Sequence, residues 1–353
     1  MIISRTPFRV TLGGGGTDLP SYYSRYGGFV FAAAIDKYMF INVNRPVVDD
    51  LVRVKYSESE TVNHRRELRH EIAREALGVM NIDRGVEIVS MADVPAGTGL
   101  GSSSCYAVGL LNALHSLKRQ PVPPQQLAEE ACHLEIQVLG KPIGKQDQYM
   151  AAFGGLSILD IGTDGTVAVT PAWLSQSIVD DLERNMLLFY TGTSRSAMDI
   201  LLEQSRGAAQ NETAVTDSLH RIKEMGFEIK EMILSGNLTE FGLALDRHWQ
   251  LKKQISSKIS NPTFDALYRL AKDNGALGGK ISGAGGGGFF TFYTERHHHR
   301  LRKAMQQAGL REMRYRFDFE GSKIMVNLMD RVTVDWRLFD DSRNARFVVA
   351  RAV

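Results

Sequence analysis

Glycine, serine and acidic residues gather in this chain where backbone and hydroxyl groups can bind oxygen-rich ligands. The central stretch, Pro95–Cys105, holds three glycines followed by three consecutive serines. It lies between a strand-like segment, 86–89, and a helical repeat that includes Ala107 and Leu111. This order offers the free N–H groups and positive dipole end of a helix to an anion. We therefore predict a phosphate-binding loop, although a glycine turn with a serine cap has the same pattern.

Two common phosphate-binding motifs are absent from this loop. No lysine follows the glycines, so the Walker A pattern GxxxxGK[ST] is not present. The pattern GxGxxG is not in register, and the acidic residue that completes the dinucleotide-binding fingerprint does not follow. A Rossmann oxidoreductase is therefore disfavoured.

Two further glycine-rich loops, Gly13–Asp18 and Ser282–Gly288, each follow a strand-like segment. Three such loops in one chain indicate backbone converging on one crowded ligand. The first loop ends in Thr17 and Asp18, and a carboxylate beside a backbone-lined pocket suits sugar hydroxyls. An ordinary turn cap is the alternative for Asp18.

Two acidic residues, Glu135 and Asp147, stand twelve positions apart downstream of the central loop. One carboxylate with the loop serines could hold a phosphate-bound Mg²⁺, which keeps several of its waters. The second, near cations, could accept a proton from a hydroxyl nucleophile. Either acid alone is equally compatible with a structural role.

The elements that must position these residues follow from the apolar periodicity and the turn residues. Tight turns and strands fill the first 60 residues, and mostly helical sequence fills 199–274. We expect strands at 8–12, 28–35, 38–44, 52–56, 156–159, 186–190 and 314–319, and a strand, loop and strand over 280–293; we expect helices at 64–77, 125–140, 199–234 with a break near 207–213, 238–258, 262–274 and 297–309.

Bulk composition sets the class of protein. The 353 residues are 43% hydrophobic and carry a formal net charge of +2, which predicts two globular domains without affinity for nucleic acid or membranes. Only Cys105 and Cys132 are present, which fits a reducing compartment. With no long apolar run and no secretion signal, a cytoplasmic location is expected.

Three motifs resemble the GHMP kinase superfamily, which includes galactokinase, homoserine kinase and mevalonate kinase. They are Thr6–Gly13, Pro95–Cys105 and Lys280–Phe290, in the family's order. The resemblance covers about 2–328 and implies a two-domain α+β fold. It predicts a ribosomal-S5-like N-terminal domain over 1–170, a ferredoxin-like C-terminal domain over 171–330 and a tail of unknown role over 331–353. The apolar pattern itself loosens over 160–185, which we interpret as the domain connection.

Within that superfamily, the segments GGGTDLP, GLGSSS and GKQDQY are similar to the branch of D-glycero-D-manno-heptose 7-phosphate kinases and fucokinases. The resemblance implies ATP-dependent phosphorylation of the anomeric C1 hydroxyl, giving a 1,7-bisphosphate on the way to nucleotide-activated heptose for surface polysaccharide. Ser104-Cys105 departs from the alanines that many relatives carry. One alternative is a fucokinase-like or other sugar kinase of the same family. The other is a sensor that binds sugar and ATP but has no activity. A homo-oligomer is compatible with this branch.

The resemblance also implies roles for individual residues, with ATP and Mg²⁺ as cofactors and a sugar phosphate as the small-molecule substrate. Asp147 would be the catalytic base and Arg9 would stabilise charge on the transferring phosphoryl group. Lys141, Lys145 and Arg25 are candidates for the acceptor's own phosphate, and Lys145 could equally keep Asp147 ionised. The implied ATP-binding residues are Pro95, Gly97, Gly99, Leu100, Gly101, Ser102, Ser103 and Ser104; the Mg²⁺ ligands are Ser103 and Glu135; the acceptor-binding residues are Gly15, Gly16, Thr17, Asp18, Lys145, Gly285 and Gly286.

Overall fold

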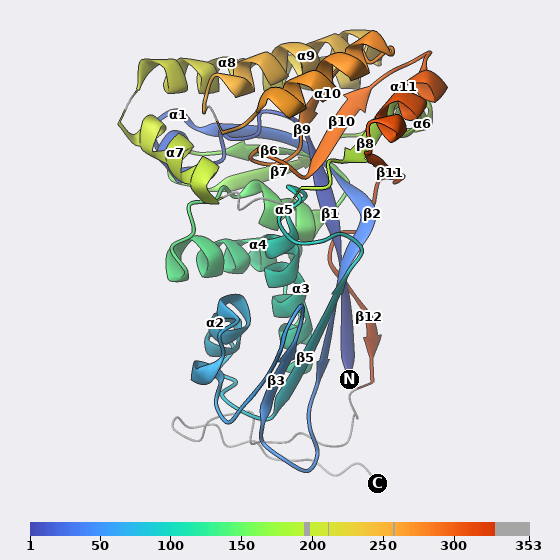
Figure 1. The fold of residues 1–353 in the computed structure, drawn as a ribbon. Coiled ribbons are helices and arrows are strands. Elements are labelled where there is room, and N and C mark those ends of the chain that lie inside the picture. Colours follow the sequence, from blue (N-terminus) through green and yellow to red (C-terminus); the bar gives the residue numbers. More distant parts are fainter. Residues whose placement is uncertain (194–197, 211, 257, 329–353) are drawn as a thin grey trace.

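The computed structural model describes residues 1–193, 198–210, 212–256 and 258–328, which form two domains stacked end to end (Figure 1). The predicted tail, 331–353, lies outside the described residues. A mixed eight-stranded sheet of order β12-β1-β2-β5-β3-β4, extended by β6 and β7 from β2, forms the N-terminal domain. Its strands are β1 (Ile2–Gly13), β2 (Gly28–Asn44), β3 (Val52–Lys55), β4 (Ser59–Val62), β5 (Val86–Ala92), β6 (Leu156–Ile161), β7 (Val167–Pro171) and β12 (Lys323–Asn327).

The two longest strands, β1 and β2, pair antiparallel from Ile2, opposite Val43, to Gly13, opposite Phe31. The sequence predicted two strands in place of β2, because the polar Asp36 and Lys37 interrupt its apolar pattern. In the structure Pro7 pairs with Tyr38 and the next residue, Phe8, pairs with Ile35. The two polar residues therefore form a bulge inside one continuous strand.

One long helix, α3 (Ser102–Leu117), packs against β1 and β2 and is buried on nearly all sides. The predicted helix 125–140 is present, but its second half, His133–Val138, is a π-helix that continues α4. The predicted helix 64–77 is a 3₁₀ turn, Arg65–Glu67, followed by α2. The other helices of this domain are α1 (Pro20–Tyr26), α2 (Glu71–Val79), α4 (Pro124–Cys132) and α5 (Gln146–Phe153).

The C-terminal domain has a four-stranded antiparallel sheet of order β11-β8-β10-β9. Numbered within the domain, this is 4-1-3-2, the order of the predicted ferredoxin-like fold. The predicted break in the long helical region is confirmed, since one helix ends at Ala209 and the next begins at Thr213. The elements are β8 (Met186–Tyr190), α7 (Met198–Ala209), α8 (Thr213–Leu234), α9 (Leu238–Lys253), α10 (Pro262–Asp273), β9 (Gly278–Ile281), β10 (Phe289–Tyr293), α11 (His298–Gln307) and β11 (Arg311–Met313).

The chain passes from the N-terminal sheet to the C-terminal sheet at the predicted connection, 160–185, but this region contains β7 and α6 (Gln176–Asn185) instead of irregular chain. Two other predictions are wrong. The predicted strand at 314–319 is reduced to one bridge between Phe317 and Ile35. The C-terminal domain also does not extend to residue 330, because β12 pairs with β1 and returns the chain to the N-terminal sheet.

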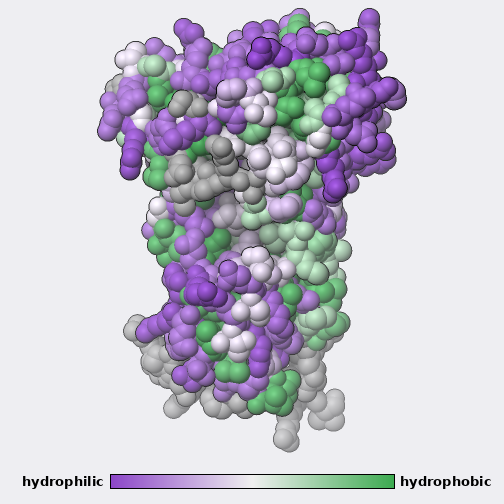
Figure 2. Space-filling view, viewed as in Figure 1, coloured by the Kyte–Doolittle hydropathy of each residue, from purple (hydrophilic) through white to green (hydrophobic). Residues whose placement is uncertain are grey.

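Hydrophilic side chains cover most of the C-terminal domain in the view of Figure 2, and hydrophobic ones appear there in small groups. Among the described helices, none is both long and apolar enough to cross a membrane. Both cysteines are buried free thiols.

Candidate active site

The central glycine loop connects β5 to the start of α3, as the sequence predicted. Gly101 precedes the helix with a φ of 88°, a left-handed conformation that favours glycine. Among the described residues no side chain caps this helix, so the serines do not act as caps. The first N–H groups of α3 are therefore available to an anion.

Arg9 on β1 and Asp147 in the first turn of α5 form an ion pair in front of this loop. The Arg9 Nε and Nη2 atoms each lie 2.7 Å from the Asp147 Oδ1 atom. The Nη1 atom donates to the Gly99 carbonyl at 2.6 Å. Arg9 is buried, with 3% of its surface exposed. Because it is bonded to both Asp147 and Gly99, it fixes the Asp147 carboxylate relative to the phosphate loop.

Glu135 lies behind the loop serines and is fully buried. Ser103 donates to its Oε1 atom, and Ser104 donates to its Oε2 atom at 2.6 Å. Gln148 also donates to Oε2, at 2.8 Å, and the Lys141 Nζ atom lies 3.7 Å from Oε1. Glu135 belongs to the π-helical segment, a distortion that often marks functional sites because it redirects side chains.

Asp18 closes the opposite side of the site, where the first glycine loop meets α5. Its carboxylate accepts from the Gly16 N–H at 3.0 Å and from the Gln146 N–H at 3.1 Å. Burial raises the pKa of Asp18, and these two bonds act in the opposite direction. A Cβ at Gly144 would lie 1.9 Å from the Asp18 Oδ2 atom, so this position requires glycine. Thr11 completes the group by donating to the Gln146 side chain at 2.7 Å.

The third glycine loop reaches the central loop across the domain boundary. A Cβ at Gly99 would lie 2.5 Å from the Ser282 carbonyl oxygen, and one at Gly283 would lie 2.6 Å from the Gly99 Cα atom. Gly99 has a φ of 78° and Gly283 a φ of 67°. The backbones of the two loops are therefore in direct contact, and neither position has room for a side chain.

These groups line one pocket of about 200 Å³ between the two domains. The predicted convergence of the three glycine loops is therefore confirmed in outline. The predicted residues that line it are Arg9, Gly15, Gly16, Asp18, Gly97, Gly99, Gly101, Ser102, Ser103, Ser104 and Asp147.

Other predicted site residues support the pocket from behind or lie elsewhere. Thr17 is fully buried, and its hydroxyl lies 2.8 Å from the carbonyl oxygens of Gly14 and Phe29, so it holds the loop rather than facing a sugar. Gly285 and Gly286 pack against Ile259 instead of the pocket. Pro95 accepts a bond from Thr98, and Leu100 is buried with its carbonyl bonded to the Arg9 N–H.

The three candidates for the acceptor's phosphate are engaged elsewhere. Lys145 donates to the Gly165 carbonyl and lies over the Tyr23 ring. Lys141 pairs with Glu71 at 2.9 Å on the donor side of the site. Arg25 donates to the Ala209 carbonyl at 3.2 Å. None of the three lines the interdomain pocket, so the structure lends these candidates no support.

Sequence reasoning missed three basic residues on the pocket wall, His248, Lys252 and Lys280. They come from α9 and β9 of the C-terminal domain. Lys280 adjoins the third glycine loop, but the other two lie in an amphipathic helix without any motif. Only the packing of α9 against β9 reveals them.

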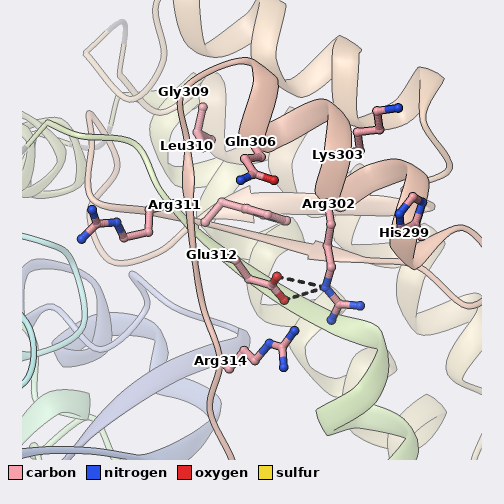
Figure 3. A pocket seen from close by; sticks show the side chains of 10 residues that line it. His299, Arg302, Lys303, Gln306, Gly309, Leu310, Arg311, Glu312 and Arg314 are labelled. Carbon is pink, nitrogen blue, oxygen red and sulfur yellow. Dashed lines mark hydrogen bonds and ion pairs between the residues drawn. The ribbon is translucent and has the colours of Figure 1, made fainter.

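A second, larger cavity of about 630 Å³ lies on the C-terminal domain, between α11 and β11 (Figure 3). Its wall is basic, with Lys303, Arg311 and Arg314, while Arg302 pairs with Glu312 at 2.8 Å. No residue predicted to do chemistry lines it. The interdomain pocket is therefore the candidate active site.

Two family profiles match the chain. The profile of the GHMP kinases N terminal domain covers residues 66–155, which include the phosphate loop, and that of the GHMP kinases C terminal covers residues 229–310. Their order and positions agree with the two domains described above.

Curated relatives agree with these profiles. The chain is 30% identical to the D-glycero-alpha-D-manno-heptose 7-phosphate kinase of Campylobacter jejuni, over 80% of this chain and 86% of that protein. It is 27% identical to the L-fucokinase/L-fucose-1-P guanylyltransferase of Bacteroides fragilis, over 81% of this chain but 34% of that longer protein.

Solved structures share the whole fold. A D-glycero-D-manno-heptose 1-phosphate kinase from Bacteroides thetaiotaomicron has a TM-score of 0.77 at 26% identity, covering 93% of this chain and 100% of that one. The galactokinase of Lactococcus lactis has a TM-score of 0.73 at 19% identity, covering 91% and 94%, and is alike in fold alone.

Proposed function

Since the chain belongs to the GHMP kinase family and is a sugar kinase of that family, we propose that it transfers the γ-phosphoryl group of ATP to the anomeric C1 hydroxyl of D-glycero-D-manno-heptose 7-phosphate. The product would be the 1,7-bisphosphate. The similarity to two heptose phosphate kinases supports this acceptor. Their names place the acceptor's phosphate at different positions, so the test includes both.

The arrangement of Arg9 and Asp147 carries the proposal. Arg9 binds only the Oδ1 atom of Asp147, and within the described chain no residue donates to Oδ2. The Oδ2 atom is left to accept the proton of the sugar hydroxyl as that oxygen attacks phosphorus. An anomeric hydroxyl is more acidic than an ordinary alcohol, so a carboxylate is a sufficient base.

Donor binding is proposed at the start of α3. The open N–H groups after Gly101 would hold the ATP phosphates, and Arg9 would neutralise charge on the transferring group. Asp18, held by two backbone N–H groups, would orient sugar hydroxyls on the acceptor side. Positioning and charge neutralisation are what phosphoryl transfer chiefly requires.

The residues present also fit a Mg²⁺ ion. Among the described residues no group of three or more histidine, cysteine or acidic side chains could enclose a metal. A phosphate-bound Mg²⁺ does not need one, since one carboxylate, one hydroxyl and phosphate oxygens suffice. Glu135 and Ser103 supply that donor set, and the ion would neutralise charge between the ATP phosphates.

A substrate screen tests the proposal. Purified protein is incubated with ATP and Mg²⁺ and either heptose 7-phosphate, heptose 1-phosphate, heptose, fucose, galactose or mannose. We expect ADP release with heptose 7-phosphate, and a product whose mass and NMR spectrum identify a new phosphate on C1. ADP release with another acceptor alone would refute the assigned substrate, and none with any sugar would refute the activity.

A further inference from the structure

Three basic side chains on the C-terminal wall of the pocket have no role in the mechanism above. His248 and Lys252 are four residues apart and therefore lie on the same face of α9. Lys280 lies on β9, against which α9 packs. All three line the interdomain pocket, and His248 and Lys280 are 1% and 4% exposed.

Backbone carbonyls, not carboxylates, hold the two lysines. The Lys252 ammonium donates to the carbonyls of Ile281 and Gly283, and the Lys280 ammonium donates to the Leu12 carbonyl at 2.9 Å. Among the described residues neither forms an ion pair. Burial, reinforced by the nearby Arg9, lowers the pKa of Lys252 to about 7. Burial, reinforced by Lys252, also lowers the pKa of Lys280 well below its usual value. The charged form of a buried lysine without a counter-charge is destabilised, so a bound anion would stabilise that form and this wall is suited to an anion.

His248 supports the same conclusion by a different observation. Both of its ring nitrogens are buried, and neither has a hydrogen-bond partner within the described chain. Buried polar groups are nearly always hydrogen-bonded, so an unpartnered one facing a pocket indicates a missing ligand. Burial lowers the pKa of His248 well below its usual value, so the neutral ring offers one N–H donor.

We propose that His248, Lys252 and Lys280 bind the phosphate that the sugar acceptor itself carries. This inference rests on the proposed function. An ammonium has three N–H donors, so Lys280 keeps two, Lys252 keeps one and His248 adds one. These four donors can satisfy the terminal oxygens of a phosphate monoester.

Lys280 connects the cluster to the acceptor side of the pocket, while Lys252 donates to Gly283, which contacts the loop residue Gly99. Lys280 is bonded to Leu12, which directly precedes the loop Gly13–Asp18, and the α7 residue Gln204 is bonded to the Gly16 carbonyl of the same loop. The donor phosphates would lie at the start of α3. A sugar held between Asp147 and Asp18 can therefore direct its far end toward α9.

The experiment compares two acceptors that differ only in the phosphate, heptose 7-phosphate and heptose. Wild type, Lys252→Met and His248→Phe, which removes the ring N–H donor, are assayed for ADP release at fixed ATP and Mg²⁺. Loss of a charge-assisted hydrogen bond is worth about 1.5–3 kcal/mol, so we expect the ratio of kcat/KM for the two acceptors to fall about 10- to 150-fold. Lys253→Met is the matched control, because Lys253 pairs with Asp265 outside the pocket and its loss should leave the ratio unchanged.

An equal fall with both acceptors would overturn the inference, since the cluster would then act on the transferred phosphoryl group or on folding. If no acceptor yields ADP, the proposed function fails and calorimetric binding decides this inference separately. Tighter binding of heptose 7-phosphate than of heptose, lost in both variants, would support the subsite. An equal affinity for both sugars in the wild type would exclude it.

Discussion

Replacing Asp147 by asparagine tests the proposed mechanism most directly. The substitution keeps the size of the side chain and the Oδ1 acceptor to which two Arg9 nitrogens lie at 2.7 Å. Arg9 also keeps its bond to the Gly99 carbonyl, so the phosphate loop should hold its shape. What is removed is the charge and the basicity of the Oδ2 atom.

The expected size of the effect follows from these contacts. A positioned general base contributes about 10²- to 10⁴-fold in rate, which corresponds to about 3–5 kcal/mol of activation free energy. We therefore expect Asp147→Asn to lower kcat by at least about 10²-fold. The KM for ATP should change by less than about threefold, because no proposed contact to the ATP phosphates is lost. Both constants come from ADP release at a saturating acceptor concentration with ATP varied.

The control is Asp180→Asn, the same chemical change at an exposed position of α6. It should leave both constants unchanged. A kcat of Asp147→Asn within about fivefold of the wild type would refute the role of Asp147 as base. A large rise in the KM for ATP would instead show that the Arg9–Asp147 pair holds the donor loop.

Three further predictions address the metal, the loop contact and pH. Glu135→Gln should raise the Mg²⁺ concentration for half-maximal activity about 10-fold or more, because it removes the carboxylate charge beside the loop serines; an unchanged Mg²⁺ titration would exclude that ligand. Gly99→Ala should lower the melting temperature and abolish activity, because its Cβ would meet the Ser282 carbonyl. The control is Gly140→Ala, which has a φ of 63° and open space around it and should cost only about 1–2 kcal/mol of backbone strain. Equal losses of stability and activity in the two variants would contradict the contact. The pKa of Lys252 is about 7 in the folded protein and about 10.4 in an unfolded chain. Between these pH values the unfolded state binds more protons than the folded state, so the free energy of unfolding should rise with pH there. In urea unfolding from pH 6.5 to 9.5, the free energy of unfolding should rise less steeply with pH for Lys252→Met than for the wild type. Identical slopes of this free energy against pH would contradict the burial of an uncompensated ammonium.

Local signals were sufficient for much of the fold and for the donor side of the site. The glycine loop between a strand and a helix, and the break between α7 and α8, depend on short-range patterns that one sequence displays. The resemblance of three motifs supplied the order of the domains and the assignment of Arg9 and Asp147 to the site, but the ion pair between them was not predicted.

Long-range contacts account for what was missed. The return of β12 to β1 pairs residues more than 300 positions apart, and nothing in the short segment 323–327 specifies its partner strand. The bulge at Asp36 and Lys37 has the same local pattern as a turn. The resemblance assigned Thr17 to the acceptor, but its contacts with two backbone carbonyls are visible only in the folded loop.

The contact between Gly99 and Gly283 has a consequence for how this chain can vary. A Cβ on Gly283 would meet the backbone of Gly99, and a Cβ on Gly99 would meet the carbonyl of Ser282, the residue before Gly283, although the two loops belong to different domains. Once one substitution has forced the loops apart, a second at the partner position has little contact left to break. The two glycines should therefore behave as a single target, with a double alanine variant less impaired than the sum of the single losses. A change in one domain can thus hide the effect of a change in the other.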